Sequence, residues 1–171
     1  QKIVLKANLF DVKKLKIKNN DRELVHHIAE RHPTVSVFPI TNNLDIYLVS
    51  QYRYMLKKTT IEAMAGFIDA NESPTDAAKR ELKEETGITA NYWEKFAQIE
   101  MSASVFRSVA HLFLAKDLKE GMAHPEEGEE IKLVKMSFEE ALKKVMIGEI
   151  NYSASVIGIL LLDRLRRKKK L

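Results

Sequence analysis

Hydrophobic and polar residues alternate along the first part of the chain, residues 2–19. Alternation with a period of two is typical of a β-strand with one face toward a core. We therefore predict a hairpin here, with one turn near Asp11 and a second turn at 19–21, followed by a third strand over 24–28. Two apolar runs, 35–40 and 44–50, flank a short polar break and predict a second, more buried hairpin.

The remaining pattern predicts more strands and three helices. Further strands are expected over 61–65, 92–100, 105–115 and 131–136, and an exposed loop over 121–130. Ser137 and Glu140 form a capping box for a helix that runs to about Ile147, and Ser153 is expected to cap a last helix through Leu162. Strands mixed with helices on their faces predict an α+β protein, an α/β/α sandwich.

A further helix is predicted to begin at about Pro74. Ser73 is a favourable N-cap, Pro74 suits the first helical position, and Asp76 completes a pattern that resembles a capping box. Strong helix formers follow, and Gly87 lies where a left-handed C-terminal cap is expected. This helix has clear signals at both ends.

Three glutamates give this helix a candidate chemistry. Glu81, Glu84 and Glu85 have the spacing i, i+3 and i+4, which places their carboxylates on one face. Like charges so close repel one another, whereas a hard divalent cation such as Mg²⁺ or Mn²⁺ would bind them. Arg80 can hold one carboxylate, and Glu72 can add another oxygen or a partner for Arg80. The alternative is a solvated acidic face balanced by neighbouring lysines.

Composition sets broader limits. The 171 residues are 45% hydrophobic and 30% charged, which is ordinary for one soluble domain. No apolar run is long enough to span a membrane, and the chain contains no cysteine, so we expect a cytoplasmic protein without disulfides or thiolate chemistry. The net charge of +4 arises largely from the basic C-terminal end, which predicts a disordered tail from about residue 164 rather than a specific nucleic-acid site.

The residues from Gly66 to Ile88 resemble the Nudix box, G-x5-E-x7-R-E-U-x-E-E-x-G-U with U apolar, at every fixed position. Outside the box, QYR at 51–53, EAMAG at 62–66 and the segment 127–162 are similar to the ADP-ribose pyrophosphatase and nucleoside-diphosphate-sugar hydrolase branch. The residues that match the box are Gly66, Glu72, Arg80, Glu81, Leu82, Glu84, Glu85, Gly87 and Ile88.

The resemblance implies a Nudix fold with a mixed central sheet and an N-terminal antiparallel extension. On that basis residues 1–32 would form the extension and residues 33–171 the Nudix hydrolase domain. Members of this branch pair through their N-terminal strands and form the substrate cleft across the two subunits. We therefore expect a homodimer.

The resemblance also implies roles for individual residues. Glu81 and Glu85 would ligate Mg²⁺, for which Mn²⁺ could substitute, together with the Ala65 carbonyl. Glu84 and Glu72 would complete the cluster, partly through water, and Arg80 would orient the glutamates.

The implied substrate contacts lie on both sides of the box. Arg53, Glu62 and Gly66 form the substrate-binding set, although the sequence without the resemblance favours a surface arginine at Arg53. The general base would be a glutamate of the 126–130 stretch, with Glu129 favoured and Glu127 next. Without the resemblance, these would be ordinary solvated carboxylates.

The expected reaction is Mg²⁺-dependent hydrolysis of the diphosphate bond in ADP-ribose or a related nucleoside diphosphate sugar. The products would be a nucleoside monophosphate and a sugar phosphate. Members that cleave ADP-ribose usually carry a proline where this chain has Ser102 and Ala103, so GDP-mannose or UDP-glucose is a comparable candidate. The alternatives are pyrophosphohydrolysis of oxidised nucleoside triphosphates and a non-catalytic nucleotide-binding module.

Overall fold

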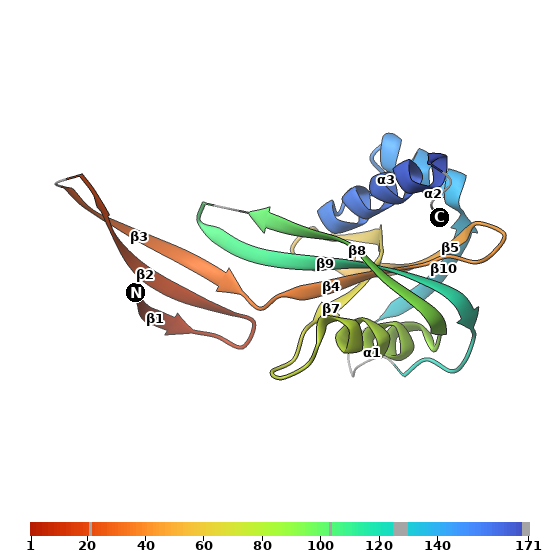
Figure 1. Cartoon of the computed structure of the whole chain (residues 1–171), viewed down its shortest axis with the longest axis horizontal. Coiled ribbons are helices and arrows are strands. Elements are labelled where there is room, and N and C mark those ends of the chain that lie inside the picture. The colour runs from red at the N-terminus through yellow and green to blue at the C-terminus, as the bar shows by residue number, and fades with distance from the viewer. Residues whose placement is uncertain (21, 103, 125–129, 169–171) are drawn as a thin grey trace.

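The computed structural model describes residues 1–20, 22–102, 104–124 and 130–168, and it contains two β-sheets and three helices (Figure 1). A seven-stranded sheet has the order β1-β2-β3-β9-β4-β7, with β8 paired to β9, and a three-stranded sheet has the order β10-β5-β6. The strands are β1 Lys2–Lys6, β2 Phe10–Asn19, β3 Arg22–Arg31, β4 Thr34–Pro39, β5 Asp45–Arg53, β6 Lys58–Glu62, β7 Met64–Phe67, β8 Thr89–Ser102, β9 Phe106–Lys119 and β10 Ile131–Ser137. The helices are α1 Pro74–Thr86, α2 Phe138–Met146 and α3 Ser153–Arg167.

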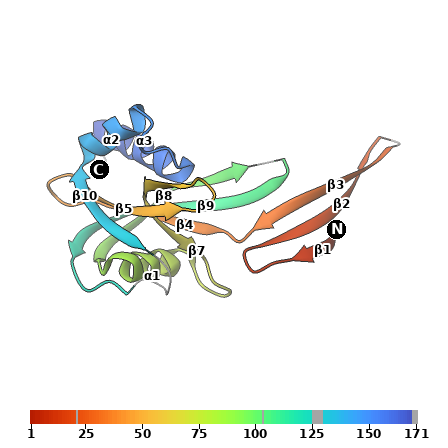
Figure 2. The same cartoon turned by 180° about the vertical axis from the view of Figure 1, so that it is seen from behind.

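The larger sheet is mixed. Strand β9 runs parallel to β3 and β4, and all other strand pairs of this sheet are antiparallel. Helix α1 covers one face of the molecule, and α2 and α3 cover the opposite face (Figures 1 and 2). The predicted α+β class, a mixed sheet with helices on its faces, is therefore confirmed.

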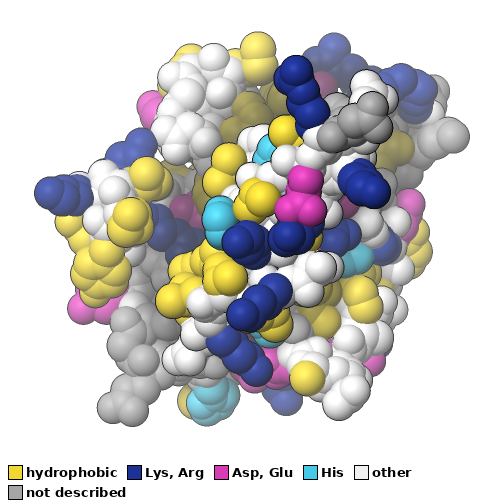
Figure 3. All heavy atoms as spheres, turned by 90° about the vertical axis from the view of Figure 1, so that its left-hand side faces the viewer, with side chains coloured by type: hydrophobic (Ala, Val, Ile, Leu, Met, Phe, Trp, Pro, Cys, Tyr) yellow, Lys and Arg dark blue, Asp and Glu magenta, His cyan; other side chains and the backbone are white. Residues whose placement is uncertain are grey.

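The N-terminal strands extend away from the helix-covered body (Figure 1). The turn after β1 spans residues 7–9, where the Ala7 N–H donates to the Phe10 carbonyl at 3.0 Å. Asp11 lies inside β2, so the predicted turn position was wrong by a few residues. Figure 3 views the molecule from this end and shows hydrophobic side chains among lysines and arginines at the surface.

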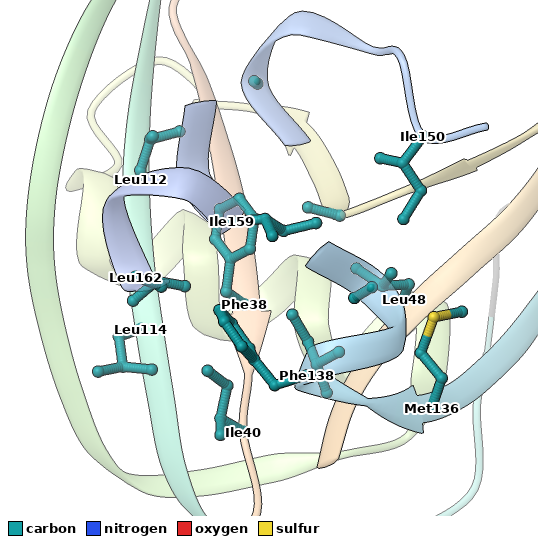
Figure 4. Packing of buried hydrophobic residues seen from close by; sticks show 14 of the residues in the cluster. Phe38, Ile40, Leu48, Leu112, Leu114, Met136, Phe138, Ile150, Ile159 and Leu162 are labelled. Carbon is teal, nitrogen blue, oxygen red and sulfur yellow. The ribbon is translucent and has the colours of Figure 1, made fainter. Parts of the chain in front are cut away.

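Two hydrophobic clusters hold the body together, one on each face of β4 and β9. Val35 and Val37 point toward α1, while the alternate residue Phe38 points toward α3, as expected for a strand. Figure 4 shows Phe38 beside Phe138 and Ile159 in the cluster on the α3 side. Gly158 permits this contact, because a Cβ there would lie 2.0 Å from the Phe38 ring.

The second predicted hairpin was wrong in its pairing. Strands β4 and β5 belong to different sheets, and the described bridge between their ends joins Ile40 and Ile46. The predicted strand at 61–65 is likewise divided into β6 and β7, which lie in the smaller and the larger sheet. At the break, the Ala63 N–H donates to the Ser155 hydroxyl at 2.9 Å, so α3 replaces the missing strand partner.

The C-terminal helix differs from its prediction at both ends. Ser153 is the first helical residue rather than the cap, and the N-cap Tyr152 makes no side-chain capping bond. The basic run does not become disordered at 164, because α3 continues to Arg167 and Asp163 pairs with Arg166 and Arg167 at 3.0 and 2.7 Å. Residues 169–171 lie outside the described part of the chain. Within that part, no helix has the length and apolar character needed to cross a membrane.

Candidate active site

Helix α1 begins and ends as its sequence predicts. The Ser73 hydroxyl accepts the Asp76 N–H at 3.1 Å, and Gly87 adopts the left-handed conformation with φ of 73°. Gly87 also allows a close approach, since a Cβ there would lie 2.4 Å from the Gly121 carbonyl oxygen. The helix buries Ala77, Ala78 and Leu82, and this packing leaves the glutamate-bearing face toward β7.

Arg80, in the middle of this helix, is the centre of a charged cluster. Its guanidinium donates to the carboxylates of Glu72 at 2.9 Å, Glu81 at 2.7 Å and Glu84 at 3.2 Å. It also donates to the Phe67 carbonyl at 2.9 Å, which ties the helix to β7. These bonds raise the pKa of Arg80 and lower the pKa of Glu72 below its ordinary value. One cation therefore gathers three acidic side chains.

Gly66 lets the Glu81 carboxylate lie against the backbone of β7. A Cβ at Gly66 would lie 1.8 Å from the Glu81 carboxyl carbon, so no larger residue fits without moving that side chain. The preceding residue, Ala65, lines the same cavity. The turn from β7 thus brings a backbone segment and a helix carboxylate together.

A cavity of about 1060 Å³ opens over this cluster. Glu62 lies on its wall, fully buried, and accepts two hydrogen bonds from the Arg53 guanidinium, at 3.0 and 2.6 Å. This bond raises the pKa of Arg53. The predicted site residues that line the cavity are Arg53, Glu62, Ala65, Gly66, Arg80, Glu81, Glu84 and Glu85.

Among the described site residues, Glu72 does not line this cavity. Glu72 is held beside Arg80, outside the lining. Glu127 and Glu129 lie outside the described residues, so their roles stay predictions.

Sequence reasoning missed a group of lining residues from other elements. Arg31 and Thr34 come from the region joining β3 to β4, and Tyr152 precedes α3. Arg31 places its guanidinium 4.6 Å from the centre of the Phe67 ring. No local pattern marks these residues, because only the pairing of β4 with β7 and the packing of α3 bring them to the cavity.

The donor set suits a hard divalent cation, because the carboxylates and the Ala65 carbonyl offer oxygen only. Among the described residues, no three acidic or histidine side chains already converge as a metal cage. The geometry gives a reason, since Arg80 draws carboxylate oxygens of Glu81 and Glu84 onto one of its nitrogens. A cation bound in the cavity would compete with Arg80 for these carboxylates.

Comparisons with known proteins bear on the family and the fold. A family model, the NUDIX domain, matches residues 30–154. The chain is 35% identical to the methanol dehydrogenase activator of Bacillus methanolicus, over 91% of this chain and 83% of that protein. It is 32% identical to the ADP-ribose pyrophosphatase of Bacillus subtilis, over 88% of this chain and 85% of that protein. A crystal structure of an ADP compounds hydrolase has the same fold, with a TM-score of 0.85 at 24% identity over 99% of this chain and 94% of that chain.

Replacing Arg80 tests whether this cation stabilises the cluster. Arg80→Met keeps the length of the side chain but removes its charge, and it should lower the free energy of unfolding by about 1–3 kcal/mol near neutral pH. Urea unfolding at several pH values measures this difference. The pKa of Glu72 is lowered below its ordinary value of 4.5. The stability lost on replacing Arg80 should therefore be full above pH 4.5 and should shrink as the pH falls through the lowered pKa of Glu72.

Lys79→Met is the matched control for this experiment, because Lys79 is an exposed cation on the same helix. It should change the unfolding free energy by less than about 0.5 kcal/mol. An Arg80 loss no larger than that of Lys79, or one independent of pH, would contradict the central role of the guanidinium.

Proposed function

Because the chain belongs to the NUDIX family and is a Nudix hydrolase, we propose that it hydrolyses the diphosphate bond of ADP-ribose or a related nucleoside diphosphate sugar, with Mg²⁺ as cofactor. The products are a nucleoside monophosphate and a sugar phosphate. The observation that carries this proposal is that Arg80, Glu81, Glu84 and Glu85 line one cavity beside the Ala65–Gly66 backbone. The similarity to a protein named ADP-ribose pyrophosphatase supports the choice of substrate class.

The cationic residues of the cavity suit a diphosphate. Its phosphorus atoms are shielded by negative oxygens, so the site must neutralise charge before water can attack. Arg53 binds Glu62 through Nε and Nη2 in a bidentate contact. Its third guanidinium nitrogen, Nη1, is the proposed donor to a substrate phosphate. Arg31, held over Phe67, is a second cation on the lining. The two arginines are the proposed phosphate contacts.

The Ala65 carbonyl, Glu81 and Glu85 are the proposed Mg²⁺ ligands, with Glu84 and Glu72 contributing through water. A divalent cation held by these residues would lower the pKa of a bound water and offset the charge on the leaving oxygen. Arg80 holds Glu81 and Glu84 near their ligating positions, and a glutamate of the 126–130 stretch, Glu129 or then Glu127, removes the proton from the attacking water.

We also propose that the chain forms a homodimer through β1–β3. The side chains of Ile17 and Leu24 are directly opposite each other in the β2–β3 pairing, and 44% and 40% of their surfaces are exposed. Further apolar side chains of β1, including Ile3 and Leu5, are about half exposed. A second copy would cover an apolar surface that an isolated subunit leaves in water.

The substrate class is tested by incubating the protein with Mg²⁺ and a panel of ADP-ribose, GDP-mannose, UDP-glucose and an oxidised nucleoside triphosphate. Mass spectrometry should find a nucleoside monophosphate and a sugar phosphate from at least one of the first three compounds. Inorganic pyrophosphate from the triphosphate alone would identify the triphosphate hydrolase instead. Nucleotide binding without cleavage, even with Mn²⁺, would identify a binding module.

Glu85→Gln tests the proposed metal ligand. The amide has nearly the same shape but no charge, so kcat should fall by at least about 100-fold while the unfolding midpoint changes little. Calorimetry should also show weaker Mg²⁺ binding. Glu100→Gln, which alters an exposed glutamate of β8 outside the cavity, should keep full turnover. Full turnover in Glu85→Gln would remove the metal-ligand assignment.

Leu24→Asp tests the proposed dimer. A charge in the apolar surface should shift the mass measured by light scattering from two chains to one. Leu160→Asp is the control, because Leu160 is exposed to a similar extent, 42%, on α3. A wild-type protein with the mass of one chain at micromolar concentrations would contradict the proposal.

A further inference from the structure

Arg31 is held at the cavity wall differently from Arg53 and Arg80. Arg53 donates to Glu62, and Arg80 donates to glutamates of the box. Arg31 makes no ion pair with a carboxylate in the part of the chain that the structure describes, and its guanidinium lies 4.6 Å from the centre of the Phe67 ring. An aromatic face attracts a guanidinium without accepting a conventional hydrogen bond from it. The N–H donors of Arg31 are therefore available to an anion in the cavity.

Phe67 contacts two of these arginines, each through a different group. Its ring lies under the guanidinium of Arg31, and its backbone carbonyl accepts a hydrogen bond from Arg80 at 2.9 Å. The backbone around Phe67 is fixed on both sides. Phe67 pairs with Thr34 of β4, and the next N–H, that of Ile68, donates to a backbone carbonyl just before β4 at 3.0 Å. The ring is thus presented to Arg31 from a strand that the sheet holds in place.

The strand end that carries Arg31 is fixed by an ion network around its neighbour Glu30. The Glu30 carboxylate accepts hydrogen bonds from Lys13 on β2 and, at 2.9 Å, from Arg107 on β9. The bond from Lys13 is the main cause of a lowered pKa of Glu30. The pairing of β3 with β9 covers only Ala29 and Glu30, so few backbone bonds share this task. Successive side chains of a strand point to opposite faces, so Glu30 can anchor the strand without obstructing Arg31.

We propose that Phe67 is a positioning residue for the substrate diphosphate. Its ring holds the Arg31 guanidinium at the cavity wall with its donors free for a phosphate, and Glu30 fixes the strand end from which Arg31 extends. This inference rests on the proposed function, since the diphosphate belongs to the same substrate. Phe67 acts through Arg31, so its contribution to affinity requires Arg31 to be present.

Binding of an uncleaved diphosphate tests this role without turnover. Calorimetry with Mg²⁺ would use α,β-methylene ADP-ribose, in which the bridging oxygen of the diphosphate is replaced by carbon. Phe67→Leu removes the ring but keeps the backbone carbonyl that binds Arg80, and it should weaken binding by about fivefold. Phe67→Tyr keeps an aromatic face and should bind within about twofold of wild type. Tyr92→Leu is the control, because Tyr92 makes a similar contact with Lys116, at 5.8 Å, outside the cavity.

A double-mutant cycle separates positioning from a general structural effect. Arg31→Met should weaken binding of the analogue by about 10-fold, because it removes a charged donor to phosphate. In that background Phe67→Leu should weaken it by less than about twofold further. A Phe67 that only supports the fold would have the same effect in both backgrounds. Unfolding midpoints check that each variant is folded, and Phe67→Met is a second variant without the ring if the leucine variant fails to fold.

Glu30→Gln tests the ion network in the same way. The amide loses the charge that attracts Lys13 and Arg107, so the analogue should bind about threefold more weakly, and this effect should disappear in the Arg31→Met background. Glu23→Gln is the matched control. It alters an exposed ion pair with Lys16 at the other end of the same strand and should bind the analogue as the wild type does.

Several results would overturn the proposal. They are wild-type affinity in Phe67→Leu, equal weakening by Phe67→Tyr and Phe67→Leu, a ring effect of the same size with and without Arg31, and failure of the wild type to bind the analogue. If the substrate panel shows cleavage but loss of the ring leaves affinity unchanged, only the positioning role fails. If the ring effect depends on Arg31 but no panel compound is cleaved, only the hydrolytic function fails.

Discussion

The contact of Arg80 with the acidic face of α1 is the interaction on which the candidate site depends. Three carboxylates that would otherwise repel one another are held within hydrogen-bond distance of a single guanidinium. The same side chain donates to the Phe67 carbonyl, so it fixes the helix to the edge strand as well. Arg80 therefore links the fold to the chemistry. A divalent cation bound at Glu81 and Glu84 would compete with Arg80 for these carboxylates.

The sheet arrangement explains why the cavity lies where it does. The chain leaves the three-stranded sheet after β6, is bridged at Ala63 by the Ser155 hydroxyl, and enters the larger sheet as β7. That break brings Glu62, on one side, and Ala65 with Gly66, on the other, to the wall of a single cavity. The start of α3 covers the same region. Ser155 of this helix therefore stabilises the break and also helps to position the site.

Local features of the chain could be predicted from sequence, and long-range pairings could not. The caps of α1 at Ser73 and Gly87 act over a few residues, and the box glutamates follow from helix periodicity. The separation of β4 from β5 was missed because a polar break between two apolar runs is the same in a hairpin and in a crossover between sheets. The helical basic end was missed because it depends on Asp163, whose pairing with Arg166 and Arg167 a charge run does not reveal. The cavity residues Arg31 and Tyr152 are brought together only by tertiary packing.

We propose that the Ala65 carbonyl, Glu81 and Glu85 form a divalent metal site in contact with a bound diphosphate. The most direct measurement is X-ray diffraction near the manganese absorption edge, from crystals grown with Mn²⁺ and a non-hydrolysable ADP-ribose analogue. We predict an anomalous density peak between these three groups, within coordination distance of an analogue phosphate oxygen. An analogue that occupies the cavity with no anomalous peak at these residues would contradict the account.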